Sequence, residues 1–321
     1  MPIMPHPDWL VIEDERFSSL VLPNGQLDSL WRGGRWCEGP AYFAAGRYLL
    51  WSDIPNDRIM RYDENDGHVS IFRQSSAFSN GQTLDREGRL VTCEHGSRSV
   101  TRTEHNGRIN TLADTYEGSR LNSPNDVTVR SDGSIWFTDP SYGIDSDYEG
   151  GLRTSEMGCH VYCLTVDGQL HRVAEDFEKP NGLAFSPDEA WLYVSDTGAT
   201  HRADGPRHIR RFRVEESHRL VGGEIFAVSD CGLFDGFRLD VAGNLWTSAG
   251  DGVHCYAPDG KRLGRILIPE TVANVCFGGV SRNRLYVCAT TSLYAVTLNT
   301  RGHHVIGEAI APSEIRTASR T

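Results

Sequence analysis

The sequence predicts an all-β fold, namely a six-bladed β-propeller with four antiparallel strands per blade. Three observations support this prediction. One unit of short strands and turns recurs six times, its copies are spaced by 42, 45, 56, 54 and 39 residues, and a spare strand near the N-terminus is available to complete the last copy. Spacings of this size are typical of propeller blades, whose sheets bury their apolar faces against one another around an axis.

Each copy of the unit opens with a polar side chain followed by a small or apolar residue. The six opening residues are Glu38, Asn80, Asn125, Asn181, Asp235 and Asn274. In the third copy, residues 126–129 form a strand, Ser131-Asp132-Gly133 makes a hairpin turn, and residues 134–139 return as a second strand. A second hairpin follows, with its own turn at 166–169 in the third copy and at 257–261 in the fifth, so each unit contains four short strands.

The last copy is short, because its pattern ends after about Leu298. Residues 27–32 alternate like an outer strand, and we expect them to pair with the last blade and close the ring. Residues 1–16 are interpreted as an N-terminal extension and 312–321 as a C-terminal tail, both loosely held. Residues 17–311 then form a single propeller domain.

The third and fourth copies are longer than the others because they contain insertions at about 141–156 and 197–208. Long connections within a compact domain are often functional. Each insertion follows the second strand of its blade, so we expect both at the same end of the propeller, as walls of a substrate pocket. The alternative is that they are surface elaborations.

Composition restricts the partners of this chain. It has 32 basic and 43 acidic residues, a net charge of −11, which disfavours nucleic acid and anionic membrane surfaces and favours a small-molecule partner. No obligatory protein partner is predicted. The first ten residues do not form a secretory signal, which predicts a cytoplasmic location. The eight cysteines include no CxxC pair and are interpreted as packing residues, Cys159 and Cys163 included.

The six opening residues carry the chemistry. In a propeller the first strand of each blade lines the axis, so these side chains meet in one funnel. Two carboxylates and four amides are the hard oxygen ligands of Ca²⁺, Mg²⁺ or Mn²⁺, and a divalent cation would offset the repulsion between the acids. We therefore predict one divalent metal ion, with Ca²⁺ the first choice and Zn²⁺ also admitted. The alternative is that these residues cap strands and turns.

From about Leu27 to Leu298 the sequence resembles the SMP-30/gluconolactonase family, also called the regucalcin family, in its bacterial gluconolactonase branch. The members are six-bladed propellers with a metal in the central channel. The motifs that carry the resemblance are Glu38-Gly39-Pro40, the stretches 48–56, 92–96 and 121–127, Phe137-Thr138-Asp139-Pro140 with Tyr142-Gly143, the stretch 179–186, and Asp235-Gly236.

The resemblance implies roles for particular residues. Glu38, Asn181 and Asp235 would be metal ligands, and Asn125 would complete the site or contact substrate. Asp235 matches the family's proposed general base, which takes a proton from the water that attacks a lactone carbonyl polarised by the metal. Whether Asp235 is a base or only a ligand is left open.

Substrate contacts are harder to transfer. Relatives of the animal regucalcins have a sugar-binding arginine two residues before the position of Asn125, where this chain has Ser123. The residues expected to line the substrate pocket are Asn80, His95, Arg98, Asn125, Tyr142 and Asn274. For His95 the alternative is a histidine that bonds backbone at a blade end.

The predicted function is metal-dependent hydrolysis of a sugar lactone, without a serine or cysteine nucleophile. Two alternatives remain: a phosphotriesterase-type hydrolase with nearly the same site, and a non-catalytic propeller that binds a ligand on its top face. Two carboxylates at the axis argue against the second alternative. The sequence leaves open the sugar, the ring size, the metal and the oligomeric state.

Overall fold

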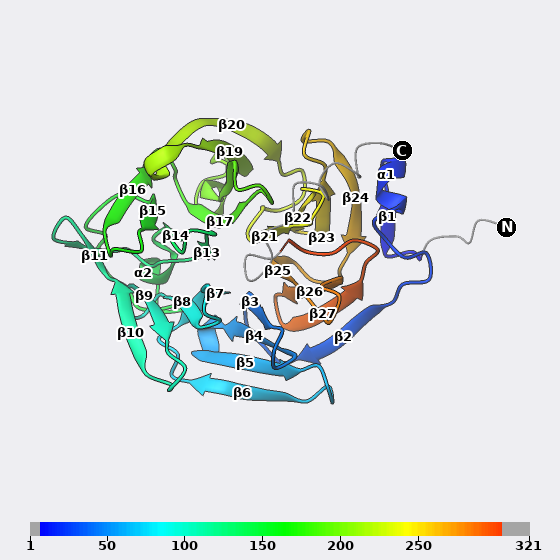
Figure 1. Ribbon diagram of the computed structural model, residues 1–321, viewed down its shortest axis with the longest axis horizontal. Coiled ribbons are helices and arrows are strands. Elements are labelled where there is room, and N and C mark those ends of the chain that lie inside the picture. Colours follow the sequence, from blue (N-terminus) through cyan, green and yellow to red (C-terminus); the bar gives the residue numbers. More distant parts are fainter. Residues whose placement is uncertain (1–6, 304–321) are drawn as a thin grey trace.

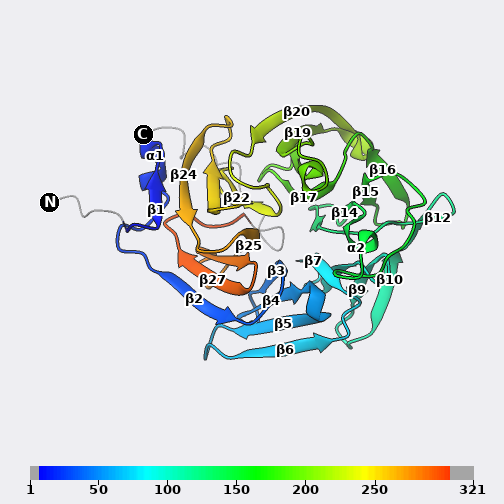
Figure 2. The ribbon, with the colours of Figure 1, turned by 180° about the vertical axis from the view of Figure 1, so that it is seen from behind.

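The computed structural model describes residues 7–303. Within this range, six antiparallel sheets of four or five strands surround a central axis, as Figure 1 shows looking down that axis. Figure 2 gives the view from the other side. The predicted six-bladed β-propeller is confirmed.

Every blade starts with its innermost strand at the axis and proceeds outwards. Blade one contains β3 (Cys37–Phe43), β4 (Tyr48–Asp53), β5 (Arg58–Asp63) and β6 (Val69–Gln74). Blade two contains β7 (Ser79–Leu84), β8 (Leu90–Glu94), β9 (Ser99–Thr103) and β10 (Ile109–Ala113). Blade three contains β13 (Val127–Val129), β14 (Ile135–Asp139), β15 (His160–Leu164) and β16 (Leu170–Ala174).

The second half of the ring follows the same order. Blade four contains β17 (Pro180–Phe185), β18 (Trp191–Asp196), β19 (His208–Val214) and β20 (Leu220–Val228). Blade five contains β21 (Phe237–Leu239), β22 (Leu245–Ala249), β23 (Gly252–Tyr256) and β24 (Arg262–Leu267). Blade six contains β25 (Val272–Gly278), β26 (Arg284–Ala289) and β27 (Ser292–Thr297), and takes its outer strand from the N-terminal part of the chain.

The remaining elements are short. They are a two-stranded ribbon of β11 (Thr115–Tyr116) and β12 (Ser119–Arg120), the helices α1 (Glu15–Ser18) and α2 (Tyr142–Asp145), and 3₁₀ turns at Ile54–Asn56, Gly198–Thr200 and Glu216–His218. No helix in residues 7–303 has the length and apolar character needed to cross a membrane. The cytoplasmic location stays a prediction.

The hydrophobic core lies between neighbouring blades. Second strands supply fully buried tryptophans, including Trp136 in β14 and Trp246 in β22. Trp136 meets Phe185 of blade four edge to face, with ring centroids 5.4 Å apart, and Trp246 meets Phe277 of blade six at 6.2 Å. Because each sheet is covered only by its neighbours, the blades stabilise one another and the inner strands are held in a fixed ring.

The ring closes as predicted. Strand β2 (Leu27–Arg32) pairs antiparallel with β27, from Leu27 opposite Val296 to Arg32 opposite Ser292. The last blade is therefore built from both ends of the chain, which leaves none of the six sheets incomplete.

The expectation of a loosely held N-terminus is wrong for part of residues 1–16. Strand β1 (Leu10–Ile12) adds a fifth strand to blade five by pairing with β24. Glu13 then forms ion pairs with Arg262 and Arg265 at 2.7 and 2.8 Å. The sequence pattern missed this strand because three residues are too few to show an alternation. Residues 1–6 and the predicted tail 312–321 lie outside the described residues.

Replacing Phe17 by alanine is expected to lower the free energy of unfolding by about 3–5 kcal/mol. Phe17 in α1 is fully buried, and its ring lies 5.7 Å from that of Trp246 in the cluster between blades five and six. Urea unfolding followed by tryptophan fluorescence measures the change. Phe72→Ala, at a position 42% exposed on β6, is the matched control and should cost less than about 1 kcal/mol. Equal effects would show that the N-terminal segment contributes little.

Candidate functional site

The six opening residues of the blades lie at one mouth of the central channel. Each stands at or just before the start of an innermost strand. Five of them are buried and Asp235 is partly buried. We call these six side chains the polar ring. They are Glu38, Asn80, Asn125, Asn181, Asp235 and Asn274.

Glycines after four of the ring residues let neighbouring inner strands approach closely. A Cβ atom on Gly182 would lie 2.1 Å from the carbonyl oxygen of Asp235, and one on Gly39 would lie 2.0 Å from that of Asn80. Gly81 and Gly236 are equally close to the next blade. The Gly182 amide donates to the Asp235 carbonyl at 3.1 Å. The recurring Asn-Gly and Asp-Gly pairs therefore serve close contact between blades, rather than the turns considered as an alternative.

Hydroxyl groups of the second strands hold the backbone of the polar ring. Ser52 in β4 donates to the carbonyl of Asn80, and Thr138 in β14 donates to that of Asn181, both at 2.7 Å. Ser195 in β18 donates to the carbonyl of Asp235 at 3.0 Å. Each bond joins one blade to the ring residue of the next, so the positions of the ring residues are coupled around the axis.

The aspartates that end several second strands hold the segment leading into an inner strand. The carboxylate of Asp139 accepts hydrogen bonds from the backbone amides of Asn122 and Ser123, both at 2.8 Å. Asp196 does the same for Glu178 and Lys179. The sequence shows these Ser/Thr-Asp endings as part of the repeat, but only the structure shows that they fix the chain just before Asn125 and Asn181.

Side-chain oxygens of four ring residues are available to a ligand. Among residues 7–303, nothing donates to the side-chain oxygens of Asn125 or Asn181, or to Oε1 of Glu38, and Asp235 accepts only from the side chain of Asn181. A cation or water can satisfy such acceptors. In the described part of the chain, no three of the His, Cys, Asp and Glu side chains gather as a metal site. The donor set is therefore one of two carboxylates and two amides, which fits a hard divalent cation.

The two acids of the polar ring destabilise each other's charge. Burial raises the pKa of Glu38 to about 8, although hydrogen bonds from Asn274 and the Gly39 amide act in the opposite direction. Burial and the negative charge of Glu38 together raise the pKa of Asp235 well above its ordinary value. A cation between them would favour both ionised forms, which is the electrostatic condition for a metal site.

Asn274 is placed differently from its predicted role in substrate binding. Its Nδ2 donates to Oε2 of Glu38 at 2.9 Å, and its Oδ1 accepts from the backbone amide of Val275 at 2.8 Å. The side chain is 1% exposed. Because both ends of the amide are used inside the protein, the geometry assigns Asn274 to orienting Glu38. The sequence shows an amide at this position but not its hydrogen-bond partners.

Asn80 and His95 form a short chain of hydrogen bonds beside the ring. His95 Nδ1 lies 3.0 Å from the carbonyl oxygen of Glu149, which can only accept, so Nδ1 carries the proton. Burial lowers the pKa of His95 to about 4, so the ring is neutral and its Nε2 accepts from Asn80 Nδ2 at 3.2 Å. This leaves Oδ1 of Asn80 buried without a partner among the described residues, as an additional acceptor facing the ring. His95 also fulfils the alternative role of a backbone-bonding histidine.

Arg98, which was predicted to line a substrate pocket, has its guanidinium engaged by protein groups. Its guanidinium donates to the carbonyls of Leu121, Asn122 and Arg120 and pairs with Glu156 at 3.3 Å. Since these contacts occupy the guanidinium, Arg98 holds the segment before Asn125 in place. The sequence could not predict this role, because any residue type can supply a backbone carbonyl.

Tyr142 links the insertions of blades three and four, which were expected at the same end of the propeller as walls of a substrate pocket. Its hydroxyl bonds Thr197 Oγ1 at 2.7 Å and Thr200 Oγ1 at 2.9 Å. Thr197 Oγ1 also accepts from Nδ2 of Asn181 at 3.3 Å, which places the phenol near the polar ring. The two insertions thus meet above the same mouth of the channel. Contact between Tyr142 and a substrate stays a prediction.

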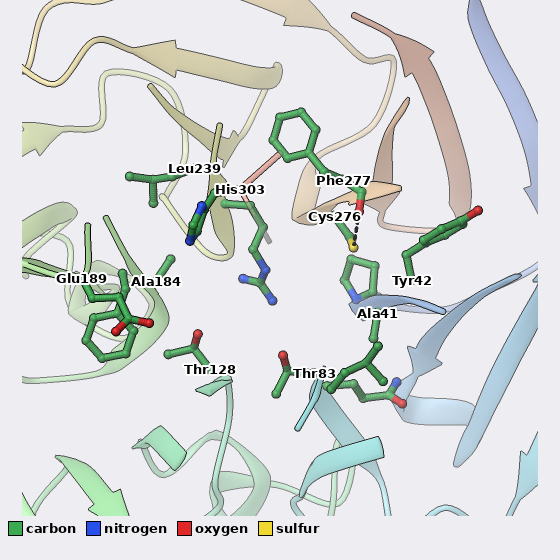
Figure 3. Close-up of a pocket in the computed structure, with 15 residues that line it drawn as sticks. Ala41, Tyr42, Thr83, Thr128, Ala184, Glu189, Leu239, Cys276, Phe277 and His303 are labelled. Atoms are coloured by element: carbon green, nitrogen blue, oxygen red, sulfur yellow. Dashed lines mark hydrogen bonds between the residues drawn. The ribbon is translucent and has the colours of Figure 1, made fainter. Parts of the chain in front are cut away.

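A separate cavity of about 130 Å³ opens at the other mouth of the channel. Residues of all six inner strands line it, and Figure 3 shows them around the opening. They include Ala41, Thr83, Thr128, Ala184, Leu239 and Cys276. They lie two to four positions further along the strands than the ring residues, so at about 3.3 Å per residue the cavity is a different site. The ion pair of Asp126 and Arg238, 3.5 Å apart, lies between the two.

A family model described as "SMP-30/Gluconolactonase/LRE-like region" matches residues 36–291, which include every residue of the polar ring. The chain belongs to this family. A gluconolactonase of Zymomonas mobilis is 33% identical over 288 residues, covering 84% of this chain and 80% of that protein.

Two further relatives bear on the chemistry. The structure of a gluconolactonase from Xanthomonas campestris is 38% identical, with a TM-score of 0.85, and the match covers 93% of this chain and 97% of the other. A diisopropyl-fluorophosphatase of Loligo vulgaris is 35% identical over 248 residues, covering 70% of this chain and 75% of the relative. The relatives thus include proteins named for lactones and one named for a fluorophosphate, the same two chemistries that the sequence left in competition.

Proposed function

We propose that this protein is a hydrolase of sugar lactones, with one divalent cation held by Glu38, Asn125, Asn181 and Asp235. The observation that carries the proposal is that these four side chains stand at one mouth of the channel with oxygens that few protein donors occupy. Oxygen ligands of this kind favour Ca²⁺, with Mg²⁺, Mn²⁺ and Zn²⁺ as alternatives. The relatives named as gluconolactonases support the substrate class.

The residues of this chain have distinct tasks in the proposed reaction. When bound, the cation supplies Lewis-acid polarisation of the lactone carbonyl and positive charge opposite the developing oxyanion. Asp235 accepts the proton of the water that attacks the carbonyl carbon. The bond from that carbon to the ring oxygen breaks, the ring oxygen leaves as a hydroxyl after taking a proton, and the product is the open-chain acid. Asn274 holds Glu38 throughout by its 2.9 Å hydrogen bond.

The second candidate is hydrolysis of a phosphotriester at the same polar ring. It is favoured by the relative named diisopropyl-fluorophosphatase, and by the fact that a cation and a carboxylate suit attack at phosphorus as well as at a carbonyl. In that reaction Asp235 would attack directly. A non-catalytic propeller has no comparable support, because it gains nothing from two repelling acids at its axis.

Removing the metal should abolish lactone hydrolysis, and restoring one ion should recover it. Chelated protein is given Ca²⁺, Mg²⁺, Mn²⁺ or Zn²⁺ singly, and acid release from δ-gluconolactone and xylonolactone is followed against the spontaneous rate. Diisopropyl fluorophosphate is tested in parallel. Turnover of lactones with a restored ion supports the proposal and ranks the ions. Metal binding with turnover of the fluorophosphate alone would replace it by the second candidate, and a protein that binds no metal would contradict both.

A further inference from the structure

Glu149 is a half-buried acid outside the polar ring. It lies in the insertion of blade three, between α2 and β15. Its side chain is partly buried, yet among residues 7–303 its carboxylate accepts no hydrogen bond and forms no ion pair. Burial alone raises the pKa of Glu149 to about 7, because no neighbouring donor acts against it. A carboxylate in such a place needs donors from elsewhere.

Glu149 lies beside the polar ring. Its backbone carbonyl accepts from Nδ1 of His95 at 3.0 Å, and Nε2 of His95 accepts from Asn80 of the ring at 3.2 Å. Burial is the main cause that raises the pKa of Glu38 and of Asp235, and the negative charge of Glu149 adds a smaller contribution to both, which agrees with this placement.

The loop that carries Glu149 is fixed in place. The amide of Gly151 donates to the carbonyl of Gly143 at 3.1 Å, and that of Arg153 donates to Ile144 at 3.0 Å. Gly143 packs so tightly on His95 that an added Cβ atom would lie 2.4 Å from the Cβ atom of His95. Glu149 is therefore held at a defined position relative to the ring, and specific recognition of a substrate requires such a fixed position.

The proposed substrates carry the hydrogen-bond donors that the Glu149 carboxylate lacks. A sugar lactone carries several hydroxyl groups around its ring, and each is a hydrogen-bond donor. The Glu149 carboxylate has two oxygens with about four acceptor positions, and neither oxygen has a partner among residues 7–303. In the proposed function Glu38 and Asp235 hold the cation, so Glu149 stays free to accept hydrogen bonds from hydroxyl groups.

We propose that the Glu149 carboxylate accepts hydrogen bonds from the hydroxyl groups of a sugar lactone bound over the polar ring, and thereby selects hydroxylated lactones over plain ones. This inference rests on the proposed lactonase function. It adds a residue that determines specificity, in a segment that is an insertion relative to the other blades.

The test compares Glu149→Gln with the unchanged protein on two lactones. δ-Gluconolactone has the hydroxyl groups, and δ-valerolactone has the same ring without them. The variant should raise KM for δ-gluconolactone about 10- to 100-fold, as expected for lost hydrogen bonds to a charged group, and change kcat/KM for δ-valerolactone less than about threefold. Glu175→Gln, on the surface of blade three at a side chain 65% exposed, is the control and should change neither.

Two binding measurements separate the possible failures. Calorimetric titration with Ca²⁺ should give the same affinity for Glu149→Gln as for the unchanged protein, and a weaker affinity would make Glu149 a cation ligand and overturn the inference. An equal loss on both lactones would overturn it as well. If the unchanged protein hydrolyses neither lactone, the proposed function fails. Binding of 1,5-anhydroglucitol, a ring polyol without a carbonyl, then decides the inference: weaker binding by Glu149→Gln supports it, and equal binding or none contradicts it.

Discussion

Replacing Asp235 by asparagine is expected to reduce kcat for lactone hydrolysis by about 10²- to 10⁴-fold, the range associated with loss of a general acid or base. Asparagine keeps the size of the side chain and one oxygen but cannot take a proton from water. Among residues 7–303 the carboxylate of Asp235 accepts only from the side chain of Asn181, and an asparagine oxygen can accept the same bond, so the change should leave the fold intact. Initial rates at saturating δ-gluconolactone and restored metal measure the effect.

The same variant should change stability in a direction that depends on the metal. Without metal, Asp235 is held in the folded protein with its pKa raised, whereas the unfolded chain ionises it freely. Asp235→Asn removes this cost, so the free energy of unfolding should rise by about 1–3 kcal/mol near pH 8. With saturating Ca²⁺ the unchanged protein should gain more stability than the variant, because the variant has lost an anionic ligand. Asp204→Asn, at a side chain 81% exposed in the blade-four insertion, is the control. Full activity in Asp235→Asn would remove Asp235 from the mechanism.

The metal-free protein is expected to lose stability as the pH rises from about 6.5 to about 8, by about 2 kcal/mol for Glu38 alone. Burial raises the pKa of Glu38 from the ordinary 4.5 to about 8 in the folded state. An acid with a raised pKa keeps its proton when folded and releases it on unfolding, so the folded state is favoured at low pH. This advantage is lost as the pH approaches 8. Urea unfolding at a series of pH values, with chelator present, measures the fall.

The expected fall in stability begins at about pH 6.5 because of the histidines. Burial lowers the pKa of His95, to about 4, and lowers those of His160, His208 and His254 below the ordinary 6.5. Folded histidines of this kind stay neutral where unfolded ones are protonated, so they make stability rise with pH up to about 6.5 and add nothing above it. Below 6.5 the two effects oppose each other. Above 6.5 only the acids act.

Metal and substitution should each suppress the fall in stability. Saturating Ca²⁺ favours the ionised forms of Glu38 and Asp235, so binding should release protons in this pH window, detectable by calorimetry in buffers of different ionisation enthalpy. Glu38→Gln should be less sensitive to pH between 6.5 and 8 than the unchanged protein. A metal-free protein whose stability is flat across this window, or rises, would mean that the acids of the polar ring are not held in the protonated state.

The fold and the polar ring could be predicted because they depend on local and repeated patterns. Strands such as β14, from Ile135 to Asp139, combine β-forming residues with a preceding Asp-Gly turn, and the repetition of this pattern fixes the number of blades. The position of Asn181 or Asp235 at the axis then follows, since each opens the first strand of its blade. Ring closure by Leu27–Arg32 followed from the shortness of the last unit.

The roles of individual polar side chains were less predictable. Arg98 and Asn274 were expected near substrate, but the first binds backbone carbonyls and the second binds Glu38. Glu149 was not singled out, because an acid in a polar insertion looks the same in sequence whether it faces solvent or the channel. Hydrogen-bond partners far apart in the chain decide such roles, and no residue pattern records them.

The sequence by itself determined the propeller, its six blades, its closure and the six residues that meet at the axis, because strand periodicity and turn chemistry are local and each blade repeats them. Only the tertiary structure decided which ring oxygens are free, which neighbours position Glu38, where the insertion places Glu149, and how β1 joins blade five. These depend on burial and on distances between separate blades, such as the 2.9 Å between Asn274 and Glu38, residues that are 236 positions apart in the chain.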